Sequence, residues 1–187
     1  EELIEGPTLH QLLEDSNNTL SADQALDIAL DMTLALEYAH SRGVTHGDLK
    51  PQNVFVTEEG VKLSDVGLGR LEEGRNLLNA PILHLNPVYL APEQILGQTI
   101  DARTDLYALG VIFYQMFAQR LPFQGTEKEI MHAHLHEAPH PPRNFTPHIS
   151  PSLEHLILKL LVKNPNARYA SAEQARRVSS SLIVNVG

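Results

Sequence analysis

Apolar residues recur at helical spacing over most of the chain, and several of these segments begin at a polar capping residue. Ser21 and Gln24 form a capping box, which predicts the start of a helix, and Gly43 marks its end. Residues 103–119 are apolar on nearly every side, which is typical of a helix buried all round. Other helices are predicted over residues 126–136, after Ser150 with Pro151 in the first turn, and after a capping box at Ser171 and Gln174.

Two short apolar segments, residues 54–56 and 61–63, have the pattern of strands joined by a turn that contains Gly60. They predict a β-hairpin, in which the first residue of one strand pairs with the last residue of the other. The pattern as a whole therefore predicts a mainly α fold of the α+β class, with one small β-hairpin.

Composition and charge narrow the class of protein. The 187 residues are 42% hydrophobic, which is enough for one substantial core. The net charge is −9 and no basic run occurs, so neither a nucleic acid nor an anionic membrane is favoured as a partner. Cysteine is absent, which excludes disulfides and thiol chemistry. Because no signal-peptide pattern and no membrane-spanning apolar run is visible, we expect a cytoplasmic protein.

Residues 46–53 carry four chemically complementary side chains within one short stretch. Asp48 can accept a proton from a hydroxyl, Lys50 can neutralise a phosphoryl oxygen, and Asn53 offers an oxygen to a hard cation such as magnesium. Asp65 follows the hairpin and supplies a second carboxylate, which strand pairing brings near Asn53. Together these groups meet the needs of phosphoryl transfer.

Three motifs in a fixed order connect these residues to a known family. His-Gly-Asp-Leu-Lys-Pro-Gln-Asn at residues 46–53, Asp-Val-Gly at 65–67 and Ala-Pro-Glu at 91–93 resemble the protein kinase signature in sequence and spacing. The Leu-Lys-Pro-Gln-Asn run is similar to the serine/threonine type. The resemblance implies the helical C-terminal lobe of a protein-kinase-like fold, with the N-terminal lobe, its glycine-rich loop and its strand lysine absent from this sequence. Its parts are a hinge-like stretch at 1–7, a catalytic loop at 46–53, an activation segment at 65–93 and a helical subdomain at 94–187.

The resemblance also assigns roles to individual residues. The implied site consists of the catalytic residues Asp48 and Lys50, the magnesium ligands Asn53 and Asp65, and the nucleotide-binding residues Glu2, Ile4 and Phe55. On spacing alone, Phe55 is equally consistent with a core residue. A short helix is expected over residues 8–14, after the hinge. ATP and Mg²⁺ are thus the expected cofactors, and a protein hydroxyl is the expected phosphate acceptor.

Four further residues are expected to support the site. His46 belongs to the catalytic loop, and Asp105 is implied to hold the backbone of His46 and Gly47. Asp105 is also favoured at its position by the helix dipole, because it falls in the first turn of the helix at 103–119. Glu93, which ends the Ala-Pro-Glu motif, is implied to pair with Arg168.

Three positions depart from the family pattern. Gly47 replaces an arginine that receives an activating phosphate, and Val66 replaces a phenylalanine. Asn86 replaces a threonine that touches the catalytic aspartate and lysine, a contact that its amide could imitate.

Two functions from different classes follow from this sequence. One is a serine/threonine kinase whose C-terminal lobe is inactive alone, and the other is a pseudokinase or lone-lobe scaffold without catalysis. The presence of all four catalytic side chains favours the kinase. The expected partners are the protein substrate, the missing lobe, and a second copy of this chain bound through the surface that would face that lobe.

Four histidines, at positions 132, 134, 136 and 140, raise the alternative of a zinc site. Only His132 and His136 share a helical face, and no carboxylate or thiolate is obviously placed to complete the site. A solvated, histidine-rich helix is therefore the favoured interpretation.

Overall fold

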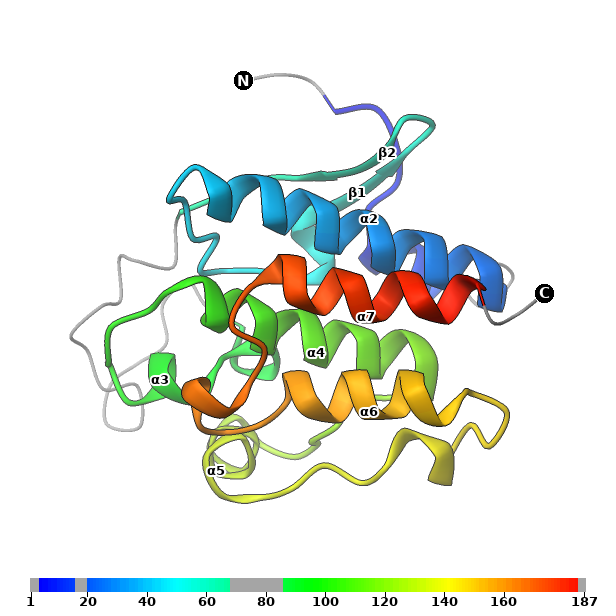
Figure 1. Ribbon diagram of the computed structural model, residues 1–187. Helices are drawn as coiled ribbons and strands as arrows, with labels where there is room; N and C mark the ends of the chain where they lie inside the picture. The colour runs from blue at the N-terminus through cyan, green and yellow to red at the C-terminus, as the bar shows by residue number, and fades with distance from the viewer. Residues whose placement is uncertain (1–3, 16–19, 68–85, 185–187) are drawn as a thin grey trace.

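The computed structural model describes residues 4–15, 20–67 and 86–184. Helices dominate these residues, and the two strands form one antiparallel hairpin, as the sequence predicts (Figure 1). The elements are α1 (Leu9–Glu14), α2 (Ala22–Ser41), β1 (Val54–Thr57), β2 (Gly60–Leu63), α3 (Pro92–Ile95), α4 (Ala102–Ala118), α5 (Glu127–His136), α6 (Pro151–Leu160) and α7 (Ala172–Val184). Short 3₁₀ turns lie at Pro51–Asn53, Pro87–Tyr89, Pro142–Asn144 and Pro165–Ala167.

Helix α4 forms the centre of the core. Asp101 caps its N-terminus, and nearly all of the residues that follow are buried, in agreement with their apolar pattern. Figure 1 shows α4 in the middle of the molecule, with α2 and α7 on the side of the hairpin and α6 on the other side. Gly110 permits the contact with α6, because a Cβ at this position would lie 2.7 Å from the Cβ of Leu160. The buried core is thus arranged around one apolar helix.

Helix α2 and the hairpin form the upper part of the molecule in Figure 1. The predicted capping box of Ser21 and Gln24 is confirmed, and Gly43 follows the helix with a φ of +70°, a left-handed conformation that suits glycine. In the hairpin, Val54 pairs with Leu63 and Thr57 pairs with Gly60. The hairpin packs on α2, and this packing fixes the end of the loop before β1 and the start of the loop after β2.

The predicted helices are confirmed to within one or two residues at each end, and α3 is an additional one-turn helix that the pattern did not indicate. Within the described ranges, no helix combines the length and the apolar character that crossing a membrane requires.

A buried ion pair joins the end of the Ala-Pro-Glu motif to the segment before α7. The two terminal guanidinium nitrogens of Arg168 donate to Glu93, Nη1 to Oε1 at 2.7 Å and Nη2 to Oε2 at 2.8 Å. The two side chains are 0% and 4% exposed. Arg168 also donates to the carbonyl oxygens of Val162, Lys163 and Arg103, and Glu93 accepts from the hydroxyl of Thr104. Because both charges are fully hydrogen-bonded, the pair is stable in the core.

Removing one partner of this pair strands the other charge in the core. We expect Arg168→Ala to lower the free energy of unfolding by roughly 3–5 kcal/mol, measured by urea denaturation of the chain. Arg177→Ala is a matched control, because Arg177 forms an exposed pair with Glu173 one turn away, and its loss should cost less than about 1 kcal/mol. Equal unfolding midpoints for the two variants would contradict this assignment.

Candidate active site

One carboxylate fixes the start of the catalytic loop. Asp105, in the first turn of α4, accepts hydrogen bonds from the backbone amides of His46 (Oδ2, 2.8 Å) and Gly47 (Oδ1, 2.8 Å). The imidazole Nε2 of His40, at the end of α2, lies 2.7 Å from Oδ2 of the same carboxylate. Gly47 has a φ of +79°, so the loop turns sharply at a residue that adopts this conformation without strain. The side chain of Gln94 holds the other side of Gly47 by donating to its carbonyl oxygen at 2.6 Å.

The carboxylate of Asp48 follows this turn, and within the described residues one of its oxygens is hydrogen-bonded and the other is not. Lys50 Nζ donates to Asp48 Oδ2 at 2.6 Å, and the side-chain amide of Asn53 donates to the same oxygen at 3.4 Å and to the Asp48 carbonyl at 2.9 Å. Oδ1 of Asp48 accepts no hydrogen bond from the residues that the structure describes. Because the nitrogen of the Asn53 amide faces Asp48, its oxygen is the atom left to bind a cation.

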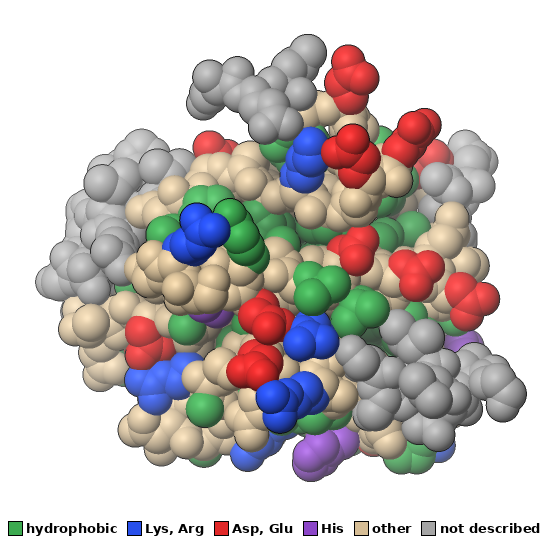
Figure 2. All heavy atoms as spheres, turned by 45° about the horizontal axis from the view of Figure 1, so that its top comes forward, with side chains coloured by type: hydrophobic (Ala, Val, Ile, Leu, Met, Phe, Trp, Pro, Cys, Tyr) green, Lys and Arg blue, Asp and Glu red, His purple; other side chains and the backbone are tan. Residues whose placement is uncertain are grey.

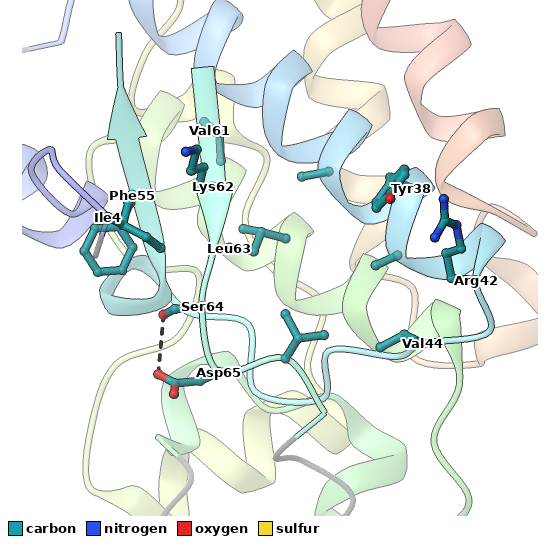
Figure 3. A pocket seen from close by; sticks show the side chains of 13 residues that line it. Ile4, Tyr38, Arg42, Val44, Phe55, Val61, Lys62, Leu63, Ser64 and Asp65 are labelled. Atoms are coloured by element: carbon teal, nitrogen blue, oxygen red, sulfur yellow. Dashed lines mark hydrogen bonds between the residues drawn. The ribbon is translucent and has the colours of Figure 1, made fainter. Parts of the chain in front are cut away.

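Asp65 lies at the base of the hairpin, directly after Ser64, whose backbone bonds to that of Asn53. Ser64 N donates to the Asn53 carbonyl at 3.0 Å, and Gly67 N donates to the His46 carbonyl at 2.8 Å, so the backbone is held on both sides of Asp65. Asp65 itself has a left-handed φ of +56°, which aspartate tolerates better than most residues. Its carboxylate is exposed and accepts from the Ser64 hydroxyl at 3.4 Å, as Figure 3 shows.

His46 is buried within the loop and acts on its backbone. Its Nδ1 accepts from the amide of Asp48 at 3.3 Å. Burial lowers the pKa of His46, against the opposing charges of Asp105 and Asp48, so the ring favours the neutral form that accepts this bond. The ring therefore stabilises the conformation that presents Asp48.

An open pocket of about 920 Å³ runs across the hairpin beside this loop. Ile4 and Phe55 line one end, the C-terminal half of α2 with Tyr38 lines the other, and Asp65 lies on its edge (Figure 3). Figure 2 turns this side of the molecule forward and shows hydrophobic side chains reaching the surface. Two of the three predicted nucleotide-binding residues thus share one pocket, and Glu2 lies outside the described residues.

Asn86 does not make the contact that was considered for its amide. It lies in one small cavity with Asp48, but Oδ1 accepts from the amide of Val88 at 3.1 Å, and no hydrogen bond joins Asn86 to Asp48 or Lys50 within the described part of the chain. The physical reason is local. Asn86 caps the 3₁₀ turn Pro87–Tyr89, where the amide of Val88 needs an acceptor.

The interpretation of α5 as a solvated histidine helix is wrong for one residue. His132 is largely exposed, whereas His134 is completely buried. The position carried a signal, because His134 continues the apolar face of Ile130 and Ala133. His40 and Gln94 were missed as supports of the loop because each bonds to a residue far away in the sequence, His40 to Asp105 and Gln94 to Gly47. In the described ranges, no group of three or more histidine, aspartate or glutamate side chains is placed to hold a metal.

Comparison with known proteins agrees with this geometry. The model of the protein kinase domain matches residues 1–179. A probable serine/threonine-protein kinase of Streptomyces coelicolor is 37% identical over 94% of this chain and 26% of its own length. A serine/threonine-protein kinase of Myxococcus xanthus is 41% identical over 81% of this chain and 23% of its own length. The serine/threonine-protein kinase PknB of Mycolicibacterium smegmatis is 32% identical over 94% of this chain and 28% of its own length. The chain spans about a quarter of the length of these relatives. By its motifs and by these matches, the chain belongs to the protein kinase family.

Proposed function

We propose that this chain is the C-terminal lobe of a serine/threonine protein kinase that transfers the γ-phosphate of ATP to a hydroxyl of a protein substrate. The observation that carries the proposal is the arrangement of Asp48. One carboxylate oxygen is held by Lys50 and Asn53, and the other, which no described residue hydrogen-bonds, can take a proton. Asp48 then orients the hydroxyl and accepts its proton, while Lys50 neutralises charge on the transferred phosphoryl group.

The two proposed metal ligands suit magnesium. Mg²⁺ prefers oxygen donors and commonly binds one or two protein groups together with the phosphates of its nucleotide. The side-chain oxygen of Asn53 and the exposed carboxylate of Asp65 lie at the same end of the hairpin and provide such donors. A magnesium ion held there supplies positive charge to the phosphates. Ile4 and Phe55 supply apolar contacts for a nucleotide base in the neighbouring pocket.

A second function, that of a pseudokinase or scaffold, has specific observations in its favour. Asn86 is engaged in capping its own turn, and Val66, where the family has phenylalanine, is 42% exposed. Neither observation removes a group that takes part in phosphoryl transfer, because Asp48, Lys50, Asn53 and Asp65 are all present. We therefore favour the kinase, with the isolated chain inactive because one wall cannot position the nucleotide.

Phosphate transfer tests the proposed function. The test uses the two-lobed parent protein, that is, the longer kinase of which we propose this chain is the C-terminal lobe. In it we expect Asp48→Ala to lower the rate of phosphate transfer about 10²- to 10⁴-fold, the usual contribution of a general base. We expect Asp65→Ala to abolish magnesium-dependent turnover. The measurement is radiolabelled phosphate transfer to a serine/threonine peptide panel, with Asp27→Ala on the exposed face of α2 as the control. The 187-residue chain alone should give background. Background signal from the wild-type parent as well would support the pseudokinase.

Activity in the parent should not depend on phosphorylation of the activation segment. The sequence between Gly67 and Val88 contains no serine, threonine or tyrosine, and Gly47 removes the arginine that would bind a phosphate. We expect phosphatase treatment to leave the rate unchanged, with mass spectrometry showing an unmodified segment. A phosphate on this segment whose removal abolishes activity would overturn this prediction.

The isolated chain should self-associate through the face that we propose the N-terminal lobe covers. Tyr38, Val44 and Val66 line the open pocket and are 63%, 40% and 42% exposed. We expect light scattering to show a molar mass that rises with concentration, and Val44→Glu to reduce the rise. Phe145→Glu is the control, because Phe145 is 39% exposed and is absent from the lining of this pocket. A single monomer mass at every concentration would contradict the prediction.

A further inference from the structure

A chain of buried and partly buried hydrogen bonds connects the helical core to the turn beside the catalytic loop. Lys163 Nζ donates to the hydroxyl of Tyr107 at 3.2 Å, and this hydroxyl lies 2.9 Å from Nδ1 of His134. Nε2 of His134 lies 3.0 Å from the carbonyl oxygen of Val88. The chain thus runs from the loop after α6, through α4 and α5, to the 3₁₀ turn Pro87–Tyr89.

The direction of these bonds is fixed at both ends. An ammonium group can only donate, and a carbonyl oxygen can only accept. Tyr107 therefore accepts from Lys163 and donates to Nδ1 of His134, which leaves the proton of the neutral imidazole on Nε2, where it donates to Val88. Each polar atom in the chain is satisfied only with His134 in this tautomer.

The surroundings of His134 favour the same neutral form. Its ring is 0% exposed and packs edge-on against Phe123, with ring centroids 5.0 Å apart. Burial, and secondarily the charge of Lys163, lower the pKa of His134 to about 3, with the hydrogen bond to Val88 opposing. The other charges nearby belong to the Arg168 guanidinium, 4.8 Å above the Tyr107 ring, and to its partner Glu93. No carboxylate contacts the imidazole directly among the described residues.

Val88 is consequently held on both sides of its backbone. Its amide donates to the side chain of Asn86, and its carbonyl accepts from His134. The flanking residues Asn86 and Tyr89 line the same small cavity as Asp48, and the Tyr89 hydroxyl donates to Gln115 of α4 at 2.8 Å. The turn that carries Val88 therefore forms one wall of the cavity that Asp48 also lines.

We propose that His134 is a positioning residue for the protein substrate, which acts by holding the Val88 carbonyl and so fixing the turn Pro87–Tyr89 against the catalytic loop. The proposal rests on the proposed kinase function. It gives α5 a role in placing the substrate, a role that the three sequence motifs and the proposed metal ligands do not have. Tyr107 and Lys163 act behind His134 by setting the tautomer of its ring.

Steady-state kinetics of the two-lobed parent tests this role. His134→Phe keeps a ring of similar size but removes both hydrogen bonds, so we expect KM for the best peptide of a serine/threonine panel to rise about tenfold, with KM for ATP within twofold of wild type. His134→Gln retains a donor and an acceptor and should restore most of the loss. His132→Phe, on the exposed face of the same helix, is the matched control. Peptide kinetics within twofold of wild type for His134→Phe would overturn the proposal.

A second measurement keeps the test independent of activity. In hydrogen exchange of the chain itself, we expect the amides of residues 88–91 to exchange at least about tenfold faster in His134→Phe than in His132→Phe. If the wild-type parent proves inactive, the kinase assignment fails, and this exchange difference still decides whether His134 holds the turn. Unchanged exchange in His134→Phe would overturn the positioning role whatever the activity.

Discussion

The catalytic loop depends on one buried carboxylate, that of Asp105. Burying an ionised carboxylate costs several kcal/mol unless its oxygens are hydrogen-bonded, and here the amides of His46 and Gly47 and the ring of His40 surround it. Its place in the first turn of α4 adds the favourable field of the helix dipole. Because α4 is the central helix of the core, the position of Asp48 follows from how that helix packs.

The same helix also holds the end of the activation segment, again through a satisfied buried charge. Glu93 accepts from Thr104 in the first turn of α4, and Arg168 donates to the backbone carbonyl of Arg103 in that turn while pairing with Glu93. The loop and the segment end are therefore both held by the first turn of α4, and Gln94 also joins them directly by donating to the Gly47 carbonyl. A shift of α4 would therefore move both together.

What the sequence could predict was local, and what it could not predict was mostly long-range. Capping boxes, helical periodicity and the hairpin turn act over a few residues, so the elements and the order of the motifs were correct. His40, Gln94 and His134 act on segments tens of residues away, on Asp105, Gly47 and Val88. The apolar face of α5 indicates that His134 is buried, but nothing local indicates the partner of any of the three. Asn86 was misjudged for the opposite reason, because its Oδ1 accepts from the amide of Val88 and this local bond orients the side chain. The metal-binding roles of Asn53 and Asp65 stay predictions.

Within the described residues, the proposed base is organised more completely than the proposed nucleotide site. The base is organised before any ligand binds, since Lys50 and Asn53 hold one oxygen of Asp48 and leave the other open, and preorganised groups of this kind carry most of the stabilisation of a transition state. The pocket of Ile4 and Phe55 is open, so a nucleotide there is contacted from one side only. In the proposed reaction, this chain therefore supplies the base for the acceptor hydroxyl, whereas tight placement of the nucleotide requires a second wall.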